Sequence, residues 1–229
     1  MVWIRYPLYF LFLTLVLWAL TWLEVTYPGS LQLQVFENPG DVRGTSEYSV
    51  LEIIQPLIIA VCGLLMGWVA LRYPSQRPLA FPFGGLAIAF FIRELDYFLD
   101  RYIADNFWQV LLGITAALVI AYTVRHRKRL QVALARIWPS PGLMLMFAGA
   151  FVLFSFVRLV GHEPLWQAIM GDSYMRIVKL ALEEFIELLG YFFWLMGSIE
   201  YALQVRATAA RDPQPAAVRR RQTRLGRRS

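Results

Sequence analysis

The chain has 229 residues, of which 58% are hydrophobic and 17% are charged, and its mean hydropathy is +0.50. These values are typical of a protein that crosses the bilayer several times, and they exclude an ordinary soluble domain. The net charge of +6 would suit a nucleic-acid-binding protein, but the basic excess is local. Residues 206–229 hold eight Arg and one Asp, and without them the 22 basic and 16 acidic residues become 14 and 15. We therefore expect no nucleic acid as a partner.

Six stretches of the chain are long and apolar enough to cross a bilayer, for which about 20 residues are needed. They lie at residues 6–23, 49–71, 81–99, 107–124, 142–160 and 177–204. The first is followed by no small-residue cleavage site, so we interpret it as a retained helix rather than a signal peptide. The pattern predicts an all-α integral membrane protein, with six transmembrane helices forming one domain of residues 1–205.

Basic and acidic connections alternate along the chain. The bases before the first span and after the second, fourth and sixth are Arg5, Arg72, Arg77, Arg125, Arg127, Lys128, Arg129, Arg136 and Arg206. The other connections carry acids, among them Glu24, Asp105 and Asp172. Because basic loops stay in the cytoplasm, we expect both termini there and a multipass location in the inner (plasma) membrane of a bacterial-type cell.

Residues 206–229 have the composition of a tail rather than of a packed element. They are rich in Arg, Ala, Gln and Pro, which predicts a disordered polybasic cytoplasmic tail. Its Arg cluster is expected to contact anionic lipid head groups. Membrane lipids are thus the expected partners, and the sequence carries no indication of an oligomeric state.

The last predicted span carries acids within an otherwise apolar helix. At about 100° per residue, Glu187 lies about 40° and Glu184 about 100° from Glu183, with Tyr191 at about 80°. The opposite side of the helix is Leu, Ile and Phe. Ionisable residues inside a membrane are costly and usually face a bundle interior or a watery cavity. This stretch therefore predicts a functional site.

Three further spans place charged residues at a similar depth under the predicted orientation. The polar residues in the outer halves of these four spans are Glu52, Gln55, Arg93, Glu94, Asp96, Tyr97, Arg158, His162, Lys179, Glu183, Glu184 and Glu187. Six acids face three fixed bases, so several carboxylates must hold protons, meet water or bind a cation. Gly63 and Gly67 share the face of Glu52 and predict close helix packing there.

Carboxylates with one imidazole suit a divalent cation such as magnesium, manganese, calcium, iron or zinc. The predicted metal ligands are Glu52, Asp96, Glu183, Glu184, Glu187 and His162. The predicted catalytic residues, acting as acid, base or ligand, are Glu94, Glu184, Glu187 and His162. The predicted substrate-binding residues are Arg93, Arg158, Lys179, Tyr97 and Tyr191.

Other interpretations of the charged residues compete with this one. Arg93 with Glu94 or Asp96 could form a structural ion pair, as could Lys179 with Glu183. Glu200, near the inner end of its span, is expected to pair with a cytoplasmic Arg. The two histidines fall on opposite sides of the membrane and the chain has no phosphate-binding loop, so we expect neither haem nor nucleotide.

Three functional classes follow from the sequence. The first is a metal-dependent membrane enzyme that acts on a lipid-linked or amphiphilic substrate at the outer leaflet. The second is a cation- or proton-coupled transporter, and the third is a structural or assembly subunit with internally paired charges. Clustering at one depth favours the enzyme, and the apolar inner halves of several spans disfavour a continuous transport path. We expect a periplasm-facing carboxylate site that binds a cation.

Overall fold

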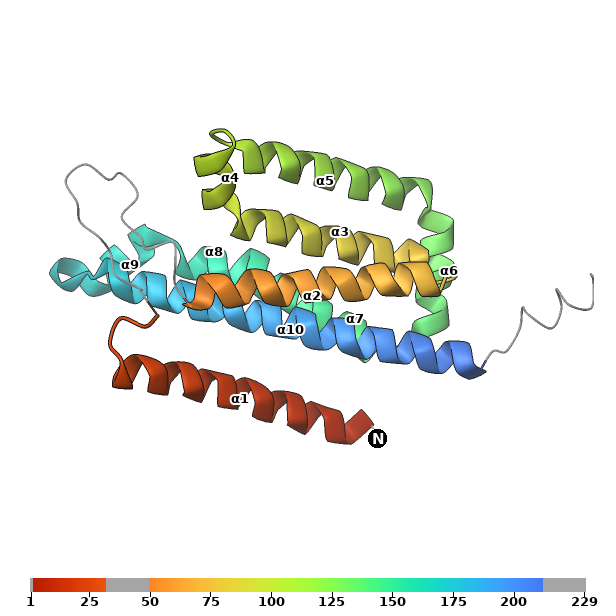
Figure 1. Ribbon diagram of the computed structural model, residues 1–229, viewed down its shortest axis with the longest axis horizontal. Coiled ribbons are helices and arrows are strands. Elements are labelled where there is room, and N and C mark those ends of the chain that lie inside the picture. The colour runs from red at the N-terminus through yellow and green to blue at the C-terminus, as the bar shows by residue number, and fades with distance from the viewer. Residues whose placement is uncertain (1, 32–49, 212–229) are drawn as a thin grey trace, which may run out of the picture.

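The computed structural model describes residues 2–31 and 50–211, and every regular element within them is a helix. Most of the long helices run lengthwise along the molecule, and α1 begins at the same end as α10 finishes (Figure 1). The elements in chain order are α1 (Val2–Thr26), α2 (Val50–Arg72), α3 (Arg77–Glu94), α4 (Asp96–Tyr102), α5 (Phe107–Arg125), α6 (Arg127–Ile137), α7 (Pro141–Phe151), the π-helical η1 (Val152–Phe156), α8 (Val157–Val160), α9 (Glu163–Met170), the 3₁₀ turn η2 (Gly171–Ser173) and α10 (Arg176–Arg211).

Several of these helices are suited to a bilayer. Within the described ranges, four stretches are long and apolar enough to cross a membrane: Ile4–Thr26, Val50–Arg72, Phe107–Arg125 and Pro141–Val160. The bent pair of α3 and α4 makes a fifth if it counts as one span. The predicted span 177–204 falls within the more polar α10, which is not among them. The prediction of an all-α protein with several membrane-suited helices is confirmed, while the count of six spans stays a prediction.

The predicted helix 81–99 is broken at Leu95, where α3 and α4 meet at 59°. The N–H of Leu95 reaches the carbonyls of Phe91 and Ile92, both at 3.2 Å, as the first helix closes. The Asp96 carboxylate then accepts a hydrogen bond from the N–H of Tyr97 at 2.6 Å. A short acidic side chain that binds the local backbone competes with helix continuation. The prediction of one continuous helix is therefore wrong at this point.

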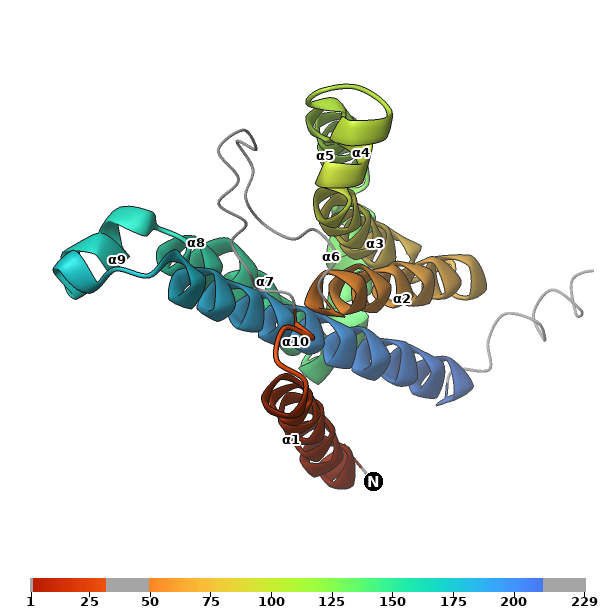
Figure 2. The ribbon, with the colours of Figure 1, turned by 60° about the vertical axis from the view of Figure 1, so that its left-hand side comes forward.

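The central element is α10, whose 36 residues extend over about 54 Å. It contacts α2, α7 and η1 (Figures 1 and 2). Glycines bring α7 and α10 together, because a Cβ on Gly149 would lie 2.7 Å from the carbonyl oxygen of Gly190. A Cβ on Gly197 would lie 2.7 Å from the carbonyl oxygen of Gly142. Small residues at such contacts let two membrane helices approach backbone to backbone.

The sequence predicted the close helix packing at two other glycines, Gly63 and Gly67 of α2. A Cβ on Gly67 would meet no atom within 4 Å, and one on Gly63 would make only an ordinary contact of 3.8 Å with Ala87. The predicted small-residue face of α2 is therefore not where the backbones approach most closely. Sequence spacing shows which glycines share a face, but not which partner helix covers it.

Two segments at the end where α10 finishes also differ from expectation. Residues 127–137, predicted as part of a basic loop, form α6. The helix α10 continues to Arg211, six residues into the segment predicted to be disordered from residue 206. The polybasic cluster of the predicted tail lies at residues 219–228, outside the described residues.

The expected partner of Glu200 is found at the same end. Arg5 donates from Nε to Glu200 Oε1 at 2.7 Å and from its terminal nitrogen to Oε2 at 2.8 Å. Tyr9 donates its hydroxyl to Glu200 Oε1 at 2.8 Å. The prediction of a Glu200–Arg pair is confirmed, and the pair ties α1 to α10.

Candidate functional site

A cavity of about 260 Å³ lies at the end of the bundle opposite the Arg5–Glu200 pair. It is lined by the start of α2, the bend between α3 and α4, and the first turns of α10. Its lining residues are Glu52, Gln55, Arg93, Glu94, Asp96, Tyr97, Phe98, Leu180, Glu183, Glu184 and Glu187. The cavity therefore gathers acids from three separate parts of the chain around one arginine.

Arg93 links α3 to α10 across one wall of the cavity through its ion pair with Glu187. Its guanidinium forms an ion pair with Glu187 and a second contact of 3.5 Å with Glu94. Tyr191, one turn after Glu187, donates its hydroxyl to Glu94 Oε1 at 2.5 Å. The side chains of Glu94 and Glu187 are almost fully buried. One base is thus shared between two buried acids, which fixes their positions relative to each other.

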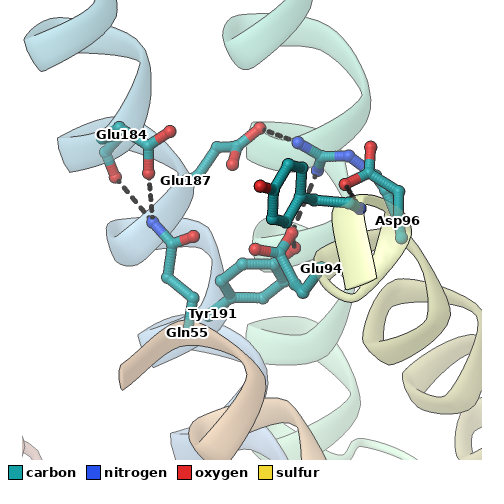
Figure 3. A network of polar contacts seen from close by, with 8 residues as sticks. Gln55, Glu94, Asp96, Glu184, Glu187 and Tyr191 are labelled. Carbon is teal, nitrogen blue, oxygen red and sulfur yellow. Dashed lines mark hydrogen bonds and ion pairs between the residues drawn. The ribbon is translucent and has the colours of Figure 1, made fainter. Parts of the chain in front are cut away.

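Glu184 has a different surrounding (Figure 3). The buried Gln55 of α2 donates Nε2 to the Glu184 carboxylate at 2.9 Å and to its backbone carbonyl at 3.2 Å. Within residues 2–31 and 50–211, no ion pair neutralises this carboxylate. Its polar partner is a neutral amide, so the Glu184 carboxyl group lies at the cavity without a cation beside it.

Glu183 belongs to another small group. Lys179, one turn earlier on α10, holds its carboxylate at 2.8 Å. The same carboxylate lies against Gly161 at the end of α8, where a Cβ would collide with it. This pair matches the structural interpretation offered by the sequence, with spacing of four residues on one helix.

The structure brings most of the predicted site residues together, but not all of them. Glu52, Asp96 and Tyr97 line the cavity with Glu94, Glu184 and Glu187. The remaining predicted residues, which lie outside the lining, are Tyr191, Lys179, Arg158 and His162. Tyr191 is buried beneath the cavity on Glu94, and Lys179 holds Glu183. Arg158 and His162 have exposed side chains at the end of α8 and before α9.

The predicted metal ligands do not fit a resident metal ion as they are arranged. In the described part of the chain, no group of three or more His, Cys, Asp or Glu side chains is placed to hold one. The cause is visible in the pairing, because Glu187 is directed to Arg93 and Glu183 to Lys179. His162 lies outside the cavity lining. We therefore derive no chemistry through a divalent metal.

Gln55, Phe98 and Leu180 line the cavity but are not among the site residues predicted from the sequence, and Gln55 is the polar one of the three. A signal was present, because Gln55 is a polar residue in an apolar span and lies three residues after Glu52, on nearly the same face. Its amide selects Glu184 from the neighbouring acids of α10. Which acid it meets depends on how α2 packs on α10, and that packing is not encoded in either helix alone.

No protein-family model matches this chain, and neither a curated protein nor a solved structure matches it. A function for the cavity therefore has to be argued from its residues and their geometry.

Proposed function

We propose that this chain is a six-span protein of the plasma membrane whose cavity binds the ammonium group of an organic cation. The apolar helices and the alternation of basic and acidic connections support the membrane placement. The end that carries Arg5, Arg77 and α6 would face the cytoplasm, and the cavity would lie in the outer half. An α10 that spans the membrane at the centre of the bundle would bring the number of spans to six.

The observation that carries the proposal is the carboxylate of Glu184. Burying an uncompensated charge is costly, so such a group gains a proton or a cation when the surroundings exclude water. Arg93 is already shared by Glu94 and Glu187, and Gln55 offers an uncharged donor. An ammonium ligand would supply the positive charge that the described residues beside Glu184 do not.

The rest of the lining favours an organic ammonium over a bare metal ion. Tyr97, Phe98 and Leu180 supply aromatic and apolar walls beside the acids. Aromatic faces attract ammonium groups and are used to recognise choline-like ligands. A water molecule has a liquid volume of about 30 Å³, so a cavity of about 260 Å³ holds several heavy atoms. A small amine or an amino head group of an amphiphile fits these walls.

Thermal unfolding of the full chain in neutral detergent tests the proposal. We expect ethanolamine, choline or putrescine to raise the Tm of the wild type, while magnesium does not. At a concentration 100 times Kd, one bound ligand stabilises by about 2.7 kcal/mol, which corresponds to a shift of roughly 5–11 °C for a chain of this size. Glu184→Gln should lose this shift, because the amide no longer attracts the cation.

Glu163→Gln is the matched control. It makes the same chemical change at an exposed carboxylate of α9 that lies outside the cavity lining and accepts a hydrogen bond from Gln167. The control variant should respond to ammonium compounds as the wild type does. Equal shifts in wild type and Glu184→Gln would contradict the proposal. A shift with magnesium alone that Glu184→Gln abolishes would point instead to a metal site.

A further inference from the structure

The helix α6 crosses the end of the bundle, whereas α5 before it and α7 after it run lengthwise (Figures 1 and 2). It contacts α3, α5 and α10 at that end. If the long helices cross a membrane, a helix in this direction lies along the membrane surface. This inference depends on the membrane placement of the chain and not on the ligand of the cavity.

The inner face of α6 is held firmly in place. Ala133 and Ile137 are buried, and Leu130 and Leu134 pack against the same core. Gln204 of α10 donates Nε2 to the carbonyl of Ile137 at 2.8 Å. The helix α6 is therefore an integral part of the fold, and one of its faces is buried against the bundle.

The outer face of α6 is basic and is not neutralised by neighbours. Its exposed charged residues are Arg127, Lys128, Arg129 and Arg136. None of them forms an ion pair with another described residue. The sequence contains no acid between Asp105 and Glu163, so the connections on either side of α6 offer no counter-charge. The positive charge faces outward.

Apolar side chains are exposed beside these bases. Val132 on α6 is 55% exposed, and Trp138, directly after the helix, is 57% exposed. Basic residues next to exposed apolar residues are the pattern of a helix that lies in the head-group region of a bilayer. Tryptophan is enriched at that depth.

We propose that the outer face of α6 binds the phosphate groups of anionic phospholipids. The charge is complementary to the phosphates, and the direction of α6 places its bases in one plane at the membrane surface. Val132 and Trp138 reach the acyl-chain boundary from the same position. The site is separate from the basic cluster at residues 219–228, which lies elsewhere in the sequence.

The test counts lipids that stay bound to the full chain. The protein in neutral detergent is incubated with equal amounts of phosphatidylglycerol and phosphatidylcholine, and bound lipids are counted by native mass spectrometry. We expect the wild type to retain phosphatidylglycerol preferentially. Arg127→Gln/Arg129→Gln should lower that preference on the order of tenfold, because each basic residue near an anionic surface contributes separately.

Two variants make the outcome specific. Arg206→Gln/Arg211→Gln removes the same charge from exposed positions of α10 at the same end and should lower the preference less than the α6 Gln variant does. Arg127→Lys/Arg129→Lys keeps the charge and should keep the preference. An unchanged preference in the α6 Gln variant overturns the proposal, as does an equal loss in both Gln variants. If Arg127→Gln/Arg129→Gln does not fold, Arg127→Lys/Arg129→Lys becomes the deciding variant. A loss of the phosphatidylglycerol preference in that variant also overturns the proposal.

Discussion

At the scale of single residues, the cavity has one wall of paired charged side chains and, beside it, one carboxyl group without a cationic partner among the described residues. Arg93 is shared between Glu94 and Glu187, and Tyr191 donates to Glu94. Glu184 is held in position by Gln55 and has no cationic partner in the part of the chain that the structure describes. Neighbouring acids on α10 therefore differ in their partners: Glu187 is paired with a base of α3, and Glu184 with an uncharged amide of α2.

The Arg93 group can be tested by removing its only shared base. Arg93→Gln should lower the free energy of unfolding by about 3–5 kcal/mol, because two buried acids lose their counter-charge. The double variant Arg93→Gln/Glu187→Gln should recover part of this loss. Reversible unfolding in mixed detergent measures the free energy of unfolding of the single and the double variant. A single variant as stable as the wild type would show that the ion pairs contribute nothing to the fold.

Part of the site could be predicted from residue order. Helical spacing and the alternation of basic loops correctly indicated that six acids belong to one region, namely Glu52, Glu94, Asp96, Glu183, Glu184 and Glu187. The Arg93–Glu94 and Lys179–Glu183 contacts match interpretations offered by the sequence. The pairing of Arg93 with Glu187 could not be predicted, because it depends on the break at Leu95. That break turns Arg93 and Glu94 toward α10 while Asp96 binds the backbone of the next helix.

At the scale of elements, α10 combines a polar first half with a closely packed second half. Its contact with α7 and η1 depends on Gly142, Gly149, Gly190 and Gly197, where added Cβ atoms would overlap the facing segment. The close approach holds α10 against α7, and the first turns of α10 then present their acids to α2 and α3. The packing of one half therefore positions the site in the other.

Gly197→Ala tests this dependence. Its Cβ would lie 2.6 Å from Met146 Cγ and 2.7 Å from the carbonyl oxygen of Gly142, so the two helices have to separate. Overpacking of this kind typically costs about 1–3 kcal/mol. Gly67→Ala is the control, since its Cβ would meet nothing within 4 Å, and its Tm should match the wild type. Equal Tm values for the two variants would show that the glycine contact is dispensable.

The elements themselves were predicted unevenly. Long apolar runs are reliable indicators, and α1, α2, α5 and the α7–α8 segment begin and end within a few residues of the expected positions. The helix α6 was missed because its bases dominate the segment, although Leu130, Ala133, Leu134 and Ile137 recur at helical spacing. Charge density identified the segment as a loop when its periodicity indicated a helix.

At the scale of the whole molecule, basic residues gather at one end of the bundle and acidic residues at the other. The connections after α2 and α5 are basic, and the cavity at the other end is acidic. Such an asymmetry orients a membrane protein, with the basic end in the cytoplasm. The beginning of α1 and the end of α10 lie at the basic end (Figure 1), in agreement with this orientation.

Single-cysteine labelling tests the orientation. Cys62 is the only cysteine and is fully buried, so it offers little background. Ser173→Cys places a thiol in the exposed η2 turn, and Ser75→Cys places one in the exposed connection between α2 and α3. A membrane-impermeant maleimide added to intact spheroplasts should label Ser173→Cys, and Ser75→Cys only after lysis. The reverse pattern would invert the orientation.

The central claim is that Glu184 and its neighbours bind an organic ammonium ion. Isothermal titration of the full chain in neutral detergent with choline measures this binding directly. We predict one binding event per chain in the wild type and in Glu163→Gln, and none in Glu184→Gln. Binding of choline that is undiminished in Glu184→Gln, or an absence of binding to the wild type at millimolar concentration, would contradict it.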